Sequence, residues 1–132
     1  ALAAESITLV DLVALTSGTE RLAAISRNAE GFLYLVALTG VTGSSAADPG
    51  VFNAFVDRVR SHARLPLYAG FGIATPEDAL RATARSDGVI IGSALIRIIE
   101  AAPSAEAAVA KVEEFLHTVH EAINPPKRSR DR

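Results

Sequence analysis

Four apolar runs alternate along the chain with segments in which apolar residues recur every three or four positions. The runs are rich in Ile, Val and Leu, which is typical of strands buried in a parallel sheet, and they lie at residues 6–15, 32–38, 66–72 and 89–91. The segments with helical spacing lie at residues 19–29, 51–63, 75–85, 94–99 and 104–123. This alternation predicts a parallel sheet with helices packed outside it.

The predicted order βαβαβαβα places the chain in the α/β class. Four βα units amount to half of a TIM (β/α)8 barrel, so we interpret residues 1–123 as one half-barrel domain. Residues 124–132 contain two prolines after Asn124, followed by four basic residues, one serine and one acid. We expect this segment to be a basic, disordered tail.

Two helix starts are marked by threonine. Thr75 is followed by a proline and two acids, a pattern that favours a capped helix with proline in its first turn. Thr19 is expected to cap the first helix in the same manner. Both assignments use only local sequence, so they do not depend on how the elements pack.

The stretch that joins the fourth strand to the short helix at residues 94–99 carries the clearest functional signal. Gly92 and Ser93 separate the two elements, so the helix begins directly at the end of a buried strand. Free backbone N–H groups and the positive end of the helix dipole meet there, which suits a phosphate. A longer helix follows Pro103, so residues 94–99 fit the short extra helix that often binds phosphate in barrels.

Glycines end three successive predicted strands. Gly43, Gly72 and Gly92 let a ligand approach backbone N–H groups closely because no Cβ intervenes, and Ser93 adds a hydroxyl. Gly43 lies in the long glycine-containing segment at residues 39–50, which is typical of a loop that covers a ligand. Together these residues predict a phosphate site, although glycines that serve only as turn residues remain an alternative.

Catalytic groups are not evident. Asp11 is the carboxylate that falls within a predicted strand, and it either lines a site or lies at an exposed edge of the sheet. The spacing of His117 and His120 allows a metal site, but we expect none. The residues alone predict a chain that binds a phosphorylated ligand, with no catalytic residues and no metal of its own. Nothing in the sequence indicates a cofactor.

Composition and charge narrow the class of protein. Of 132 residues, 49% are hydrophobic and 21% are charged, as in globular proteins. The tail carries a net charge of +3, which leaves −5 for the rest of a chain whose total is −2, and this argues against nucleic acid. There is no cysteine for a disulfide and no run of about 18 apolar residues for a membrane span. Because the chain begins with Ala1 and lacks a signal-like segment, we expect a trimmed chain or part of a longer one.

Several motifs, in order and spacing, closely resemble the tryptophan synthase alpha subunit. They are GFLYLV at residues 31–36, GVTG at 40–43, GFGI at 70–73 and DGVIIGSAL at 87–95. The resemblance runs from about residue 7 to residue 123. The combination is specific, whereas GFG and DGV-type strand ends taken singly also occur in other phosphate-binding barrels.

This resemblance implies a TIM barrel in which the chain forms strands five to eight. It implies a lyase of tryptophan biosynthesis, which cleaves indole-3-glycerol phosphate to indole and glyceraldehyde 3-phosphate and passes indole to a beta subunit. The phosphate would lie at Gly43, Gly72, Gly92 and Ser93. Tyr34 matches a tyrosine near the active site, Phe71 an aromatic that lines the indole pocket, and Thr42 a loop threonine that closes over the site. The location implied is the cytoplasm, or the plastid stroma in a plant or alga.

The two catalytic carboxylates of that family, a glutamate and an aspartate, lie in the first half of the barrel and have no match here. We therefore expect the chain alone to be inactive and to self-associate or pair with a missing N-terminal half. The alternatives are a non-catalytic half-barrel that binds phosphate or the beta subunit, and another phosphate-barrel enzyme. No nucleic-acid or membrane partner is expected.

Overall fold

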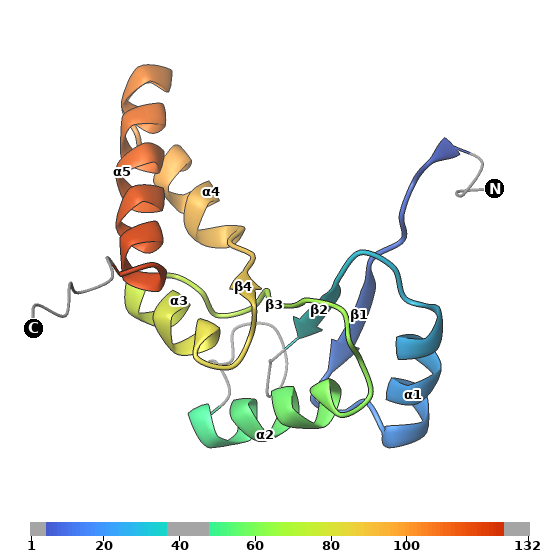
Figure 1. Ribbon diagram of the computed structural model, residues 1–132. Helices are drawn as coiled ribbons and strands as arrows, with labels where there is room; N and C mark the ends of the chain where they lie inside the picture. The colour runs from blue at the N-terminus through green and yellow to red at the C-terminus, as the bar shows by residue number, and fades with distance from the viewer. Residues whose placement is uncertain (1–4, 37–47, 126–132) are drawn as a thin grey trace, which may run out of the picture.

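The computed structural model describes residues 5–36 and 48–125 (Figure 1). The described elements are β1 (Asp11–Ala14), α1 (Thr19–Asn28), β2 (Leu33–Val36), α2 (Pro49–Arg60), β3 (Leu67–Ala69), α3 (Pro76–Thr83), β4 (Gly88–Val89), α4 (Ser93–Glu100) and α5 (Ala105–Ile123). The four strands form one parallel sheet in the order β1-β2-β3-β4. The predicted α/β class and the alternation of strands and helices are confirmed.

The strands are shorter than their apolar runs. The run at residues 6–15 becomes a strand only at Asp11–Ala14, and residues 6–9 before it are exposed. The reason is the pairing partner: β1 is matched residue for residue with β2, which itself has four described residues, Leu33–Val36. A strand extends only as far as a neighbour can pair with it.

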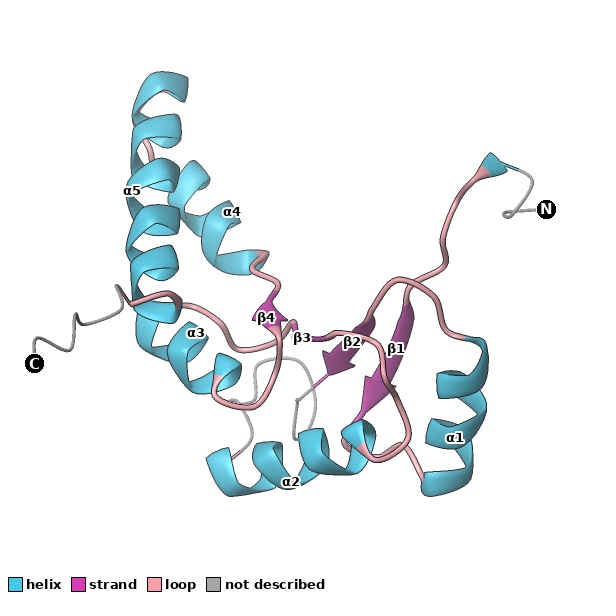
Figure 2. Ribbon diagram, viewed as in Figure 1, coloured by secondary structure: helices cyan, strands magenta, loops and turns pink. Residues whose placement is uncertain are grey.

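The sheet has one covered face and one open face. Val13, Leu35 and Ala69 lie side by side in register and are almost fully buried. Their core also contains side chains from all three of α1, α2 and α3, among them Leu22, Phe55 and Ala79. Figure 2 shows helices α1 and α2 along one side of β1 and β2.

The alternate row of the sheet is not buried in this way. Leu12 is 58% exposed, and its register partners Tyr34 and Tyr68 are half-buried. Because side chains alternate between faces along a strand, these residues share the face opposite the core. Within the described residues, nothing covers this second face as the helices cover the first.

Of the two helix caps predicted from local sequence, one is confirmed. The Thr75 hydroxyl accepts a hydrogen bond from the Asp78 N–H at 3.1 Å, and the Asp78 carboxylate accepts from the Thr75 N–H at 2.9 Å, so the predicted cap of α3 is confirmed. Ser104 caps α5 through the Ala107 N–H at 3.2 Å. Thr19 is wrong as a cap, because Gly18 holds the N-cap position of α1 and Thr19 is the first helical residue.

Asp87 links the amino ends of β3 and β4 through hydrogen bonds. Its carboxylate accepts a hydrogen bond from the Leu67 N–H at 2.8 Å, and its own N–H donates to the Leu67 carbonyl at 2.8 Å. Arg60 of α2 forms an ion pair with the same carboxylate at 3.0 Å. Partial burial acts to raise the pKa of Asp87, but the hydrogen bonds from Arg60 and Leu67 and the Arg60 charge outweigh it and lower the pKa.

The C-terminal helix joins the core through the neighbouring helices. Helix α5 packs against both α3 and α4, and its Val119 is buried in the main core. No helix among the described residues is long and apolar enough to cross a membrane. The proposed tail begins at Asn124, and its residues from 126 onward lie outside the described part of the chain.

Candidate functional site

Two loops that contain predicted site residues follow the carboxyl ends of β3 and β4. The first follows β3 and contains Gly70, Phe71 and Gly72, and the second follows β4 and leads through Gly92 into α4. The strands are parallel, so both loops leave from the same end. The Gly70 N–H donates to the Leu35 carbonyl at 3.2 Å, and the Ile90 N–H donates to the Ala69 carbonyl at 2.8 Å, which ties each loop to the neighbouring strand.

Tyr34 joins the second strand to the first of these loops. Its hydroxyl donates a hydrogen bond to the Gly70 carbonyl at 2.8 Å, and its ring meets that of Phe71 edge to face at 6.0 Å between centroids. Burial raises the pKa of Tyr34, so the phenol stays protonated and remains a hydrogen-bond donor. Two of the predicted site residues, Tyr34 and Phe71, are therefore brought together.

Gly70 is a residue beside the proposed site that the sequence reasoning missed. A Cβ at Gly70 would lie 1.9 Å from Cζ of Tyr34, so the tyrosine ring occupies the space that any side chain would need. Gly70 is the first glycine of the GFGI motif, but the sequence does not show whether such a glycine is required by backbone conformation or by a neighbouring side chain. Only the fold brings Tyr34, 36 residues earlier in the chain, against it.

Gly72 and Gly92 have different reasons to be glycine. Gly72 has φ of +75°, a left-handed conformation that favours glycine. Gly92 has ordinary negative φ, and a Cβ built on it would meet nothing within 4 Å. The backbone at Gly72 is constrained by conformation, whereas Gly92 is surrounded by open space.

The N-terminus of α4 offers free donors at this edge. Gly92 is its N-cap, and no side chain caps it, in contrast to the side-chain caps of α3 and α5. The first N–H groups of a helix lack partners within the helix. Gly92 and Ser93 are both exposed, so this end of α4 presents backbone donors, a hydroxyl and a partial positive charge to solvent.

Two predicted site residues, Thr42 and Gly43, lie outside the described residues. The structure therefore places five of the seven: Tyr34 and Phe71 in contact, and Gly72, Gly92 and Ser93 on two loops at one edge of the sheet. Phe71 is 37% exposed, which leaves part of its ring available to a ligand.

Asp11 does not lie with these residues. It pairs in register with Leu33, which is fully buried on the covered face, whereas Tyr34 pairs with Leu12 on the opposite face. Asp11 is half-buried and sits at the start of the edge strand β1. Its position favours the edge interpretation. Across residues 5–36 and 48–125, no group of three or more His, Cys, Asp or Glu side chains is arranged to hold a metal ion.

The chain is similar throughout to one family of known proteins. The family model described as "Tryptophan synthase alpha chain" matches residues 1–124. The tryptophan synthase alpha chain of Dehalococcoides mccartyi is 40% identical over 116 residues, covering 88% of this chain and 44% of the relative. That of Phenylobacterium zucineum is 36% identical over 132 residues, covering 99% and 48%.

Solved structures give the same result. The crystal structure of tryptophan synthase subunit alpha from Legionella pneumophila superposes with a TM-score of 0.78 at 31% identity, covering 92% of this chain and 44% of that one. The chain thus spans about half the length of the relatives it matches. Sequence and fold agree, and the chain belongs to the tryptophan synthase alpha chain family.

Proposed function

We propose that the chain supplies the C-terminal, phosphate-binding half of a (β/α)8 barrel that cleaves indole-3-glycerol phosphate to indole and glyceraldehyde 3-phosphate. Membership of the tryptophan synthase alpha family supports the reaction, and the four βα units in a chain about half as long as its relatives support the half-barrel. The proposed domain is residues 1–123, with a basic tail from residue 124.

The observation that carries this proposal is that the Gly72 turn and the uncapped start of α4 both lie at the carboxyl end of the sheet. Backbone N–H groups at Gly72, Gly92 and Ser93 would bind the phosphate, with Gly43 as the third loop. Such a site needs no lysine or arginine, because backbone amides and the helix dipole attract the anion. This part of the site holds the substrate and does no chemistry on it.

The indole end of the substrate would lie against Tyr34 and Phe71. Their edge-to-face contact leaves apolar ring surface beside the phosphate loops, and Thr42 would belong to the loop that closes over the site. Retro-aldol cleavage breaks a carbon–carbon bond and needs a placed acid and base. In the proposed assembly, the glutamate and aspartate of an N-terminal half supply these groups.

The open face of the sheet supports a need for that second half. Leu12 on this face is 58% exposed, and β1 and β4 each have a neighbour on one side only within the described sheet. Unpaired edges and uncovered apolar side chains favour association with another chain. The proposed partners are an N-terminal half-barrel or a second copy of this chain, and then a tryptophan synthase beta subunit.

An indole-release assay tests the reaction. The chain is assayed on indole-3-glycerol phosphate alone and after mixing with the separately produced N-terminal half of the Dehalococcoides mccartyi relative. We expect no turnover by the chain alone and turnover by the mixture. An intact-mass measurement on the same sample shows that the chain has its expected size. Turnover by this chain alone would contradict the proposal that the catalytic carboxylates come from an N-terminal half.

A glycerol phosphate titration tests the phosphate site separately. Gly92→Asp should abolish binding, because the new carboxylate would cap α4 and repel the anion. Gly18→Asp is a matched control, since Gly18 is also an uncapped N-cap with no atom within 4 Å of a built Cβ. Equal binding by both variants would remove Gly92 from the site.

A second candidate is a half-barrel that binds phosphate or the beta subunit without catalysis. The position of Asp11, on the face opposite Tyr34, favours it, because no carboxylate of the described strands then faces the proposed indole pocket. The mixing assay distinguishes the two candidates: a phosphate-binding chain that never restores turnover with an N-terminal half belongs to the second.

A further inference from the structure

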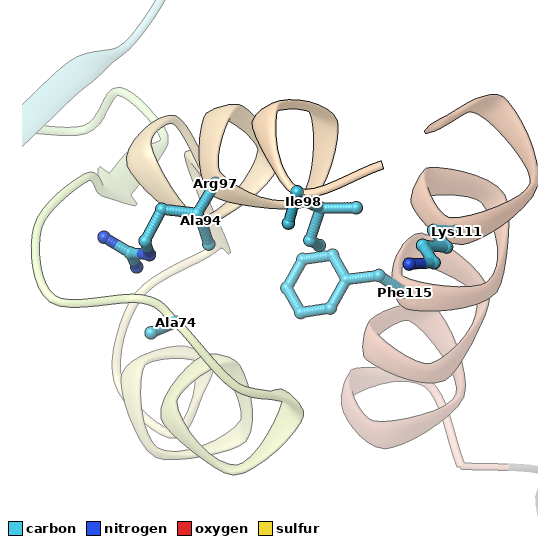
Figure 3. A pocket seen from close by; sticks show the side chains of 7 residues that line it. Ala74, Ala94, Arg97, Ile98, Lys111 and Phe115 are labelled. Atoms are coloured by element: carbon cyan, nitrogen blue, oxygen red, sulfur yellow. The ribbon is translucent and has the colours of Figure 1, made fainter. Parts of the chain in front are cut away.

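A cleft lies between α4, α5 and the loop that precedes α3 (Figure 3). Its volume is about 370 Å³, and it is lined by three alanines, Ile98, Phe115, Arg97 and Lys111. The proposed phosphate residues Gly72, Gly92 and Ser93 are not among the lining residues, but Ala74 and Ala94 follow them closely in the chain, so the cleft adjoins the proposed phosphate site. Its volume is within the range of about 300–1,000 Å³ that is usual for small-molecule sites.

The cleft has an apolar centre. The Ile98 and Phe115 side chains approach each other across it from α4 and α5, and both are half-buried. Ala94 is 5% exposed and forms part of the inner wall. A flat apolar group placed here would contact an aromatic ring and an aliphatic chain at once, and would remove their surfaces from water.

Both polar side chains that line the cleft are cationic. Arg97 extends from α4 toward Ala74, and Lys111 lies on the other side of Phe115 (Figure 3). No carboxylate is among the lining residues, and the ion pairs found between described residues use neither cation. The charge of the cleft is therefore uniformly positive and without an internal counter-ion in the described part of the chain.

We propose that this cleft binds a small aromatic carboxylate. The ring would lie between Ile98 and Phe115, and the carboxylate would pair with the guanidinium of Arg97, whose planar donors match two carboxylate oxygens. The ammonium of Lys111 adds attraction from the opposite side. Inorganic phosphate fits less well, because it has no apolar surface to place against the centre of the cleft. The proposal stands independently of the phosphate site at α4.

The test uses 1-naphthoate as the probe and 1-naphthalenemethanol, which has the same ring system without the charge, as its control. Binding to the full chain is followed by NMR through backbone amide shifts. We expect naphthoate to shift amides at residues 94–101 and 111–115, and naphthalenemethanol to bind at least tenfold more weakly. Shifts spread over the open sheet face around Leu12, or equal binding of the two probes, would overturn the proposal.

Charge variants complete the test. The double variant Arg97→Gln/Lys111→Gln should weaken naphthoate binding about tenfold and leave naphthalenemethanol unchanged, since two exposed charges each contribute a few-fold. Arg21→Gln, on the exposed surface of α1, is the matched control and should bind as the parent does. Unchanged affinity of the double variant for naphthoate would show that the cleft is not this site.

Discussion

The two ends of the parallel sheet are built on different principles. At the amino end, Leu67 is fully buried and Asp87 links β3, β4 and α2 through two hydrogen bonds and an ion pair. At the carboxyl end, Phe71, Gly72, Gly92 and Ser93 are exposed and the start of α4 lacks a side-chain cap. One end satisfies its polar groups internally, whereas the other leaves donors available to a ligand.

The difference shows how a marginally stable domain separates stability from binding. Buried, paired groups contribute to the free energy of unfolding, and unsatisfied donors at the surface contribute to affinity. Substitutions at the amino end should therefore change stability. Those at the carboxyl end should change binding, with Gly70 as the informative exception.

The largest effect is expected at the amino end. Leu67→Ala removes a fully buried side chain from the core and should lower the free energy of unfolding by about 2–5 kcal/mol. Phe71→Ala at the carboxyl end, 37% exposed, should cost clearly less despite the larger side chain. Urea denaturation of the two variants measures both values. Equal losses would remove the distinction between the ends.

Gly70→Ala should be the costly substitution of the carboxyl end. A Cβ there would lie 1.9 Å from Cζ of Tyr34, and overpacking of this kind lowers stability by about 1–3 kcal/mol. Tyr34→Ala removes the obstructing ring, so a double-mutant cycle should show that Gly70→Ala costs less in the Tyr34→Ala background. Additive effects would show that the Tyr34 ring does not restrict this position.

Asp87 makes the amino end sensitive to acid. The pKa of Asp87 is lower in the folded state than in the unfolded state. The carboxylate therefore contributes to the free energy of unfolding above the unfolded-state pKa of about 3.9, and this contribution is lost as the pH falls from that value toward the folded-state pKa. Asp87 is partly exposed, so solvent screening limits the contribution to about 1 kcal/mol.

Asp87→Asn should flatten the fall in stability between about pH 5 and pH 3, as measured by urea denaturation at several pH values. Asp57→Asn is the control, because the Asp57 carboxylate pairs with Arg85 at 3.3 Å in an exposed position. If Asp57→Asn flattens the profile as much as Asp87→Asn does, the link between β3 and β4 is not the source of the acid sensitivity.

The smallest effect is expected at Gly92. Gly92→Ala meets nothing within 4 Å and should leave stability within about 0.5 kcal/mol of the parent. Gly72→Ala, at φ of +75°, should cost about 1 kcal/mol by comparison. Thermal unfolding of the pair measures the contrast. A large loss at Gly92 would mean that its role is structural and that the open space around it serves no ligand.

Local sequence predicted the features that local interactions determine. The cap of α3 at Thr75 follows from four consecutive residues, and the alternation of strands and helices follows from apolar spacing. Features set by distant neighbours were missed or left open. The contact of Tyr34 with Gly70 joins residues 36 apart, and the face on which Asp11 lies depends on its register with Leu33. The predicted cap at Thr19 is wrong because Gly18, the residue before it, is the N-cap of α1.

Strand β4 is short, and this determines how closely the proposed phosphate site at α4 is joined to the sheet. Its last ladder bond, from Ile90 N–H to the Ala69 carbonyl, is followed after two residues by the start of α4 at Ser93. Two residues can span only a short distance, so the carboxyl end of β4 leads into α4 without a long connecting loop. The direction of α4 is therefore fixed both by this short connection and by its packing against α5.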